Sequence, residues 1–155
     1  MNTKLRATFY FLLGASIILL DQISKHMALS FLSQGAYTIT SFLRFNLVFN
    51  RGISFGIFNS TDTVSFLFVT GCIALVTLIV AITAYVGFLN NKQIVGEVLI
   101  IAGSLSNLLD RLTHRAVIDF IQLSYKGWAW PVFNCADCCI VLGVILIIIK
   151  QYRSR

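Results

Sequence analysis

Charged residues are scarce in this sequence. They make up 12% of its 155 residues, against about 25% in an average soluble domain, while hydrophobic residues make up 57%. A soluble domain of this size cannot hide so much apolar surface, because small domains leave much of their surface in water. The excess must therefore face lipid, and the sequence predicts one membrane-embedded domain over residues 1–155.

The chain also lacks the marks of a nucleic-acid-binding or a disulfide-stabilised protein. Its net charge is +6, but the basic residues form short clusters beside apolar runs, as at Lys4, Arg6, Lys92, Lys150, Arg153 and Arg155. Such clusters are typical of anchors that face anionic headgroups, so membrane lipid is the expected partner and nucleic acid is not. The four cysteines lie in apolar stretches, where cysteine behaves as a small hydrophobe, and they indicate no disulfide framework.

Long apolar segments set the predicted fold. A bilayer core of about 30 Å needs roughly 20 apolar residues in a helix. Four segments qualify, at about residues 7–28, 64–89, 93–112 and 132–149. The fourth follows Pro131, which suits the first turn of a helix because its missing N–H is not needed there. We therefore predict an all-α membrane protein with four transmembrane helices.

Two stretches outside these segments are expected on one side of the membrane. Residues 30–63 alternate aromatic or aliphatic with polar residues, which predicts short strands that form a small β-rich cradle between the first two helices. Residues 113–131 contain Trp128 and Trp130, which fit the headgroup belt.

The orientation in the membrane is predicted from the acidic residues. Lysine and arginine are divided evenly between the two sides, so their count does not decide it. With both termini and the turn at 90–92 in the cytoplasm, all five aspartates fall outside and Glu97 alone falls inside. The outer basic residues then have carboxylates nearby, and the inner ones lack them.

Several charges lie within the predicted helices, where each usually has a partner or a function. Asp21 and Lys25 are spaced i, i+4 and can pair on one helix face. Asn107, Asp110 and Arg111 crowd one side of the third segment, so Asp110 is expected to have local donors that keep it ionised. Structural ion pairs and contacts between helices explain these residues as well as a function does.

Asp119 and Asp137 lack such partners. Asp137 has no cation on its own segment, and Asn134 is its only polar neighbour on that helix face; Asp119 lies in an apolar stretch just beyond the third segment. Burial disfavours the charged form of an unpaired carboxyl. If the two groups face each other, they can share one proton and carry out general acid–base chemistry.

The residues leave two other functions open at this point. Intramembrane aspartates also relay protons in transporters, although here they cluster on one side of the membrane. A metal site is the second alternative, built from Cys135, Cys138, Cys139, His26 and His114. No second C-x-x-C pair completes a tetrahedral set.

Asn50, Gly52 and Gly56 suggest a tight turn that a ligand can approach closely, or a plain surface loop.

Five motifs, in order, resemble those of the lipoprotein signal peptidases (signal peptidase II). They are Asp21-Gln22-Ile23-Ser24-Lys25, Asn50-Arg51-Gly52-Ile53-Ser54-Phe55-Gly56, Gly103-Ser104-Leu105-Ser106-Asn107-Leu108-Leu109-Asp110-Arg111, Val117-Ile118-Asp119-Phe120 and Phe133-Asn134-Cys135-Ala136-Asp137. The resemblance covers essentially the whole chain. One such motif is weak evidence, but five with matching spacing are specific.

The resemblance implies an aspartic endopeptidase of the bacterial cytoplasmic (inner) membrane. It implies removal of the signal peptide from diacylglyceryl-modified prolipoproteins, with cleavage just before the lipid-bearing cysteine at the outer (periplasmic) face. Asp119 and Asp137 match the catalytic positions. Positions implied to hold substrate or order the site are Asn50, Gly52, Asn107, Asp110, Arg111, Asn134, Ala136, Asp21 and Lys25. A water between the aspartates would attack without metal or cofactor. Sensitivity to globomycin is a further expectation, and a monomer is the default.

Overall fold

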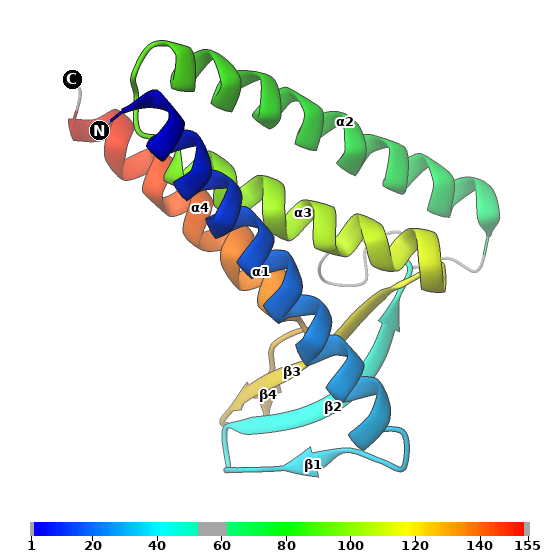
Figure 1. Ribbon diagram of the computed structural model, residues 1–155. Helices are drawn as coiled ribbons and strands as arrows, with labels where there is room; N and C mark the ends of the chain where they lie inside the picture. The colour runs from blue at the N-terminus through cyan, green and yellow to red at the C-terminus, as the bar shows by residue number, and fades with distance from the viewer. Residues whose placement is uncertain (1, 53–61, 154–155) are drawn as a thin grey trace.

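The computed structural model describes residues 2–52 and 62–153. Within these ranges the helices pack into a bundle, and the strands form a sheet at the end of the bundle opposite the two termini (Figure 1). The helices are α1 (Thr3–Phe31), α2 (Thr63–Leu89), α3 (Val95–His114) and α4 (Cys135–Arg153), and the strands are β1 (Tyr37–Thr38), β2 (Leu43–Asn50), β3 (Val117–Tyr125) and β4 (Trp128–Ala129). The predicted turn residue Gly56 and the basic Arg155 lie outside the described residues.

Three of the helices, α1, α2 and α4, are long and apolar enough to cross a membrane. The chain is therefore a multi-pass membrane protein by length and composition. Helix α3 forms where the third segment was predicted, but Glu97, Asp110 and Arg111 make it too polar to count with the other three. It contacts all of them and lies between α2 and the pair of α1 and α4 (Figure 1).

Helices α3 and α4 run antiparallel with their backbones in contact, because glycines face the crossing. A Cβ atom on Gly143 would lie 2.5 Å from the carbonyl oxygen of Gly96, and one on Gly103 would lie 2.6 Å from that of Ala136. Small residues at a helix interface allow such an approach in membranes. The contact at Ala136 holds the first turn of α4 against the half of α3 that is nearer the sheet.

The fourth helix begins at Cys135, so the predicted start at residue 132 is wrong. Phe133 forms a β-bridge with Ile121, and its N–H donates to the Ile121 carbonyl at 2.9 Å. Residues before Asn134 are therefore held by the sheet, and Pro131 is not in the first turn of the helix. Helix α1 extends beyond its predicted range at both ends.

The sheet is antiparallel in the order β1-β2-β3-β4. The predicted cradle between the first two helices is only half of it, because β3 and β4 come from residues 113–131. Strands β2 and β3 pair with Val48 opposite Asp119 and Asn50 opposite Val117. This register brings Asn50 beside Asp119 where the sheet meets the helices.

At the end of the bundle near the termini, one basic residue has a carboxylate partner that the sequence did not predict. Lys150 lies 3.5 Å from Glu97, so the expectation that the inner basic residues lack carboxylates is wrong for this one. Arg6 is buried, donates to the side chain of Asn91 and lies over the ring of Phe88. Arg6 therefore ties the start of α1 to the turn between α2 and α3.

Candidate functional site

Asparagine and aspartate side chains from four elements meet where the bundle reaches the sheet. Asn50 ends β2, Asn107 lies on α3, Asp119 lies on β3, and Asp137 lies in the first turn of α4, just after Asn134. Hydrogen bonds join all five of these side chains into one cluster. The structure thus brings together the two aspartates that the sequence singled out.

Asp119 is 2% exposed, and its two carboxylate oxygens accept from different amides. Asn50 Nδ2 donates to Oδ2 at 3.0 Å, and Asn134 Nδ2 donates to Oδ1 at 2.7 Å. Burial, and after it the negative charge of Asp137, raise the pKa of the Asp119 carboxyl to about 7, although the two amide hydrogen bonds favour its ionised form. A group with this pKa gains and loses its proton near neutral pH.

Asp137 and Asn134 cap the start of α4 reciprocally. The Asn134 side-chain oxygen accepts from the Asp137 N–H at 2.9 Å, and Asp137 Oδ2 accepts from the Asn134 N–H at 3.2 Å. This is the arrangement of a capping box, with an acidic side chain three residues after the cap. Asn134 therefore precedes the helix, and the prediction that it shares a helix face with Asp137 is wrong.

The amide of Asn107 connects the cluster to a buried cation. Lys25 Nζ donates to Asn107 Oδ1 at 2.7 Å, and Asn107 Nδ2 donates to Asp137 Oδ1 at 2.9 Å. An ammonium group only donates, so it fixes which end of the amide faces Asp137. Asn134 Nδ2 also lies 3.2 Å from Asn107 Oδ1. Within residues 2–52 and 62–153 the ion pairs do not include Asp119 or Asp137.

Lys25 instead belongs to a buried ion triad. It lies 2.6 Å from Asp21 and 2.8 Å from Asp110, and all three side chains are at most 1% exposed. The predicted i, i+4 pair is confirmed. The predicted local donors of Asp110 are wrong, because its side-chain partners are Lys25 and Gln22 of α1.

The two carboxylates of this triad also hold the backbone beside each candidate aspartate. Asp21 Oδ1 accepts from the N–H of Ala136 at 2.7 Å, next to Asp137. Asp110 Oδ2 accepts from the N–H of Ile118 at 3.2 Å, next to Asp119. One buried lysine thus pairs with both of the carboxylates that position the two segments.

Arg111 bonds the two residues that directly follow β2. Its guanidinium donates to the backbone carbonyls of Gly52 and, at 3.2 Å, of Arg51, and it lies 5.6 Å from the ring centre of Phe66. The N–H of Gly52 donates to Asn50 Oδ1 at 3.0 Å. Gly52 is therefore held from both sides, and the Asn50 side chain that bonds Asp119 is fixed with it.

Sequence reasoning assigned no role to two polar side chains of this region. Ser106 is fully buried and donates to Asp21 at 2.7 Å, and Gln22 donates to Asp110 at 2.9 Å and to Ser106. A polar residue inside an apolar helix was the available signal. For the parts of the chain described, no three His, Cys, Asp or Glu side chains are grouped to hold a metal ion.

Solved structures with this arrangement of helices and strands exist. Two solved structures described as a bacterial membrane enzyme, obtained by the in meso method, superpose with TM-scores of 0.75 and 0.76 at 24% sequence identity. The matches cover 95% and 96% of this chain, and 89% and 95% of those chains. At this identity the likeness shows the fold alone.

Sequence comparisons identify the family. The family model described as signal peptidase (SPase) II matches residues 13–153. A lipoprotein signal peptidase of Thermodesulfovibrio yellowstonii is 38% identical over 139 residues, covering 89% of this chain and 90% of the relative. Another, of Dichelobacter nodosus, is 34% identical over the full length of both proteins. The chain therefore belongs to the signal peptidase II family.

Proposed function

We propose that this protein is an aspartic endopeptidase that removes signal peptides from diacylglyceryl-modified prolipoproteins, cutting just before the lipidated cysteine. Asp119 and Asp137 are the catalytic residues in this proposal. The observation that carries it is their setting: Asp119 is buried and Asp137 is half-buried, both are hydrogen-bonded to amides, and no cation pairs with either among the described side chains. A carboxyl held in this way can change its protonation state near neutral pH.

The mechanism follows from two carboxyl groups that hold one proton between them. The ionised carboxyl takes a proton from a water molecule as that water attacks the scissile carbonyl carbon. The protonated carboxyl donates to the carbonyl oxygen, and a proton then goes to the leaving amine as the C–N bond breaks. The pKa of about 7 at Asp119 suits this exchange. No covalent intermediate, metal or cofactor takes part.

The remaining predicted site residues order this pair. Asn107 and Asn134 orient the carboxylates, and Asn50 with Gly52 forms the rim of the substrate site that Arg111 holds in place. Asp21, Lys25 and Asp110 form the frame behind Ala136 and Ile118.

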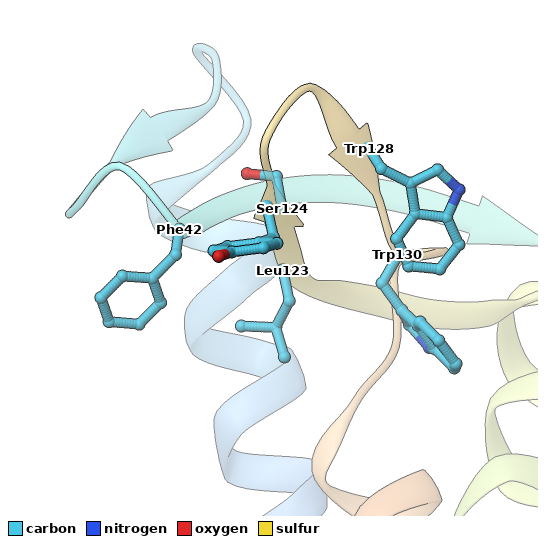
Figure 2. Close-up of a pocket in the computed structure, with 6 residues that line it drawn as sticks. Phe42, Leu123, Ser124, Trp128 and Trp130 are labelled. Atoms are coloured by element: carbon cyan, nitrogen blue, oxygen red, sulfur yellow. The ribbon is translucent and has the colours of Figure 1, made fainter.

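We further infer a placement in the bacterial cytoplasmic membrane, as a monomer, with four spans. Helix α3 is 20 residues long, which gives about 30 Å of helix, and it is the fourth span. Both termini face the cytoplasm, and the sheet lies at the periplasmic surface. At the tip of the sheet, an apolar cavity of about 340 Å³ is lined by Phe42, Leu123, Trp128 and Trp130 (Figure 2). Tryptophan prefers the headgroup region, so this tip supports the placement of the sheet at the interface.

Cleavage of a lipidated prolipoprotein by the reconstituted protein tests the function. Asp119→Asn and Asp137→Asn should each lower the cleavage rate at least a hundredfold, the order of magnitude of general acid–base catalysis, while still retaining substrate. Asp62→Asn is the matched control, because Asp62 caps α2 through Ser65 and asparagine caps equally well. Full activity in either catalytic variant would disprove the catalytic role proposed for the two aspartates. Cleavage of the unlipidated precursor at an equal rate would disprove the proposed preference for a lipidated substrate.

A further inference from the structure

A second cavity lies far from the aspartates, at the end of the bundle that holds both termini. It has a volume of about 450 Å³ and is lined by residues of the first turn of α3 and the last turns of α4. Leu146, Ile147 and Ile149 form its apolar part. Its charged part consists of Glu97, Lys150 and Arg153.

The charged part favours an anion. Lys150 and Arg153 are spaced i, i+3, so they lie on one face of α4. Glu97 is the one acid of the lining and lies 3.5 Å from Lys150, which leaves a net positive lining. An anionic group near Arg153 therefore meets an attractive field.

The apolar part favours a hydrocarbon chain below that anion. Leu146 lies one helical turn before Lys150, which corresponds to about 6 Å along the helix axis. It belongs to α4, a helix long and apolar enough to cross a membrane, whose final turn reaches headgroup depth. Phosphate above and acyl chain below is the chemistry of a glycerophospholipid, and a soluble phosphate would leave the apolar wall uncovered.

We propose that this cavity binds one anionic glycerophospholipid from the leaflet that the termini face. Its phosphate contacts Lys150 and Arg153, and one acyl chain covers Leu146 and Ile149. Basic pockets between helices on the cytoplasmic side are suited to such headgroups. The site is independent of the proposed peptidase activity, and its occupant bridges α3 and α4 at the end opposite the aspartates.

Native mass spectrometry of the full chain in neutral detergent tests this site. Phosphatidylglycerol should add as a single tightly bound lipid. Phosphatidylcholine with the same acyl chains, and glycerol 3-phosphate without chains, should each bind at least tenfold more weakly. Lys150→Gln combined with Arg153→Gln should weaken phosphatidylglycerol binding at least tenfold, since each substitution removes a charge-assisted contact.

The control removes the same charge at the same end of the bundle. Lys4→Gln combined with Lys92→Gln should change the binding of phosphatidylglycerol less than twofold. Arg153→Gln alone keeps the contacts of Lys150 with α3, and so should keep the fold while still weakening binding. An equal loss of phosphatidylglycerol binding in the two double variants would overturn the proposed site. Equal binding of phosphatidylglycerol and phosphatidylcholine would overturn it as well.

Discussion

Asp119 should make the folded protein less stable as pH rises, and Asp119→Asn should remove that dependence. In the folded chain its pKa is raised from 3.8 to about 7. Below pH 3.8 both the folded and the unfolded chain hold this proton, so it has no effect. Between the two values the folded chain alone retains it, so stability falls as pH rises, and above about 7 the loss is complete.

The size of the effect follows from this window. From pH 5 to pH 8 the unfolded chain has released the proton, while the folded chain keeps it over roughly the first two pH units. Each unit is worth about 1.4 kcal/mol, so Asp119 should lower the free energy of unfolding by about 2.7 kcal/mol over this interval. The shift comes chiefly from burial at 2% exposure, so solvent screening reduces it little.

Unfolding in mixed detergent micelles at pH 5, 6, 7 and 8 measures this difference. Wild type and Asp119→Asn are compared at each pH, so that titrations common to both proteins cancel. The variant also changes hydrogen bonds to Asn50 and Asn134, which shifts its curve by an offset but not by a slope. Parallel curves for the two proteins across this range would refute the raised pKa and with it the proton exchange assigned to Asp119.

Further predictions concern the frame of the site and the helix crossing. Lys25→Met should cost about 3–5 kcal/mol of unfolding free energy in the same assay, because it leaves buried carboxylates unpaired, and adding Asp110→Asn should restore part of it. A loss below about 1 kcal/mol would contradict the triad. Gly143→Ala should cost about 1–3 kcal/mol, because the new Cβ would lie 2.5 Å from the carbonyl oxygen of Gly96. Gly14→Ala, whose Cβ would lie 3.7 Å from its nearest neighbour, is the control and should cost nothing.

The parts of the structure that sequence predicted depend on near neighbours in the chain. Hydropathy located α1, α2 and α4, because a span is recognised from its own residues. The spacing of Asp21 and Lys25 predicted their ion pair. Alternation in residues 30–63 predicted strands where β1 and β2 lie.

The parts that sequence missed depend on partners far along the chain. Asp110 pairs with Lys25, 85 positions earlier, and not with its own neighbours. Helix α4 starts late because Phe133 pairs with Ile121, and the sheet takes strands from two separate stretches. Local spacing carries no information on such pairings. It did mark Asp119 and Asp137 as carboxylates without local cations, and their catalytic role stays a prediction until cleavage is measured.

The helix that carries Asn107, Asp110 and Arg111 is also the one that hydropathy identifies least well, and both facts have one cause. Asp110 and Arg111 are charged residues of this helix, and both are at most 4% exposed. Charges at membrane depth are tolerated when they face the interior of a bundle and are paired. Helix α3 meets this condition because α1, α2 and α4 all contact it. Helix α1 supplies Lys25 and Gln22 as partners of Asp110, and α2 supplies Thr70 to Arg111. The three apolar helices thus shield Asp110 and Arg111 of α3 from lipid, and the proposed fourth span needs no strong apolar signal of its own.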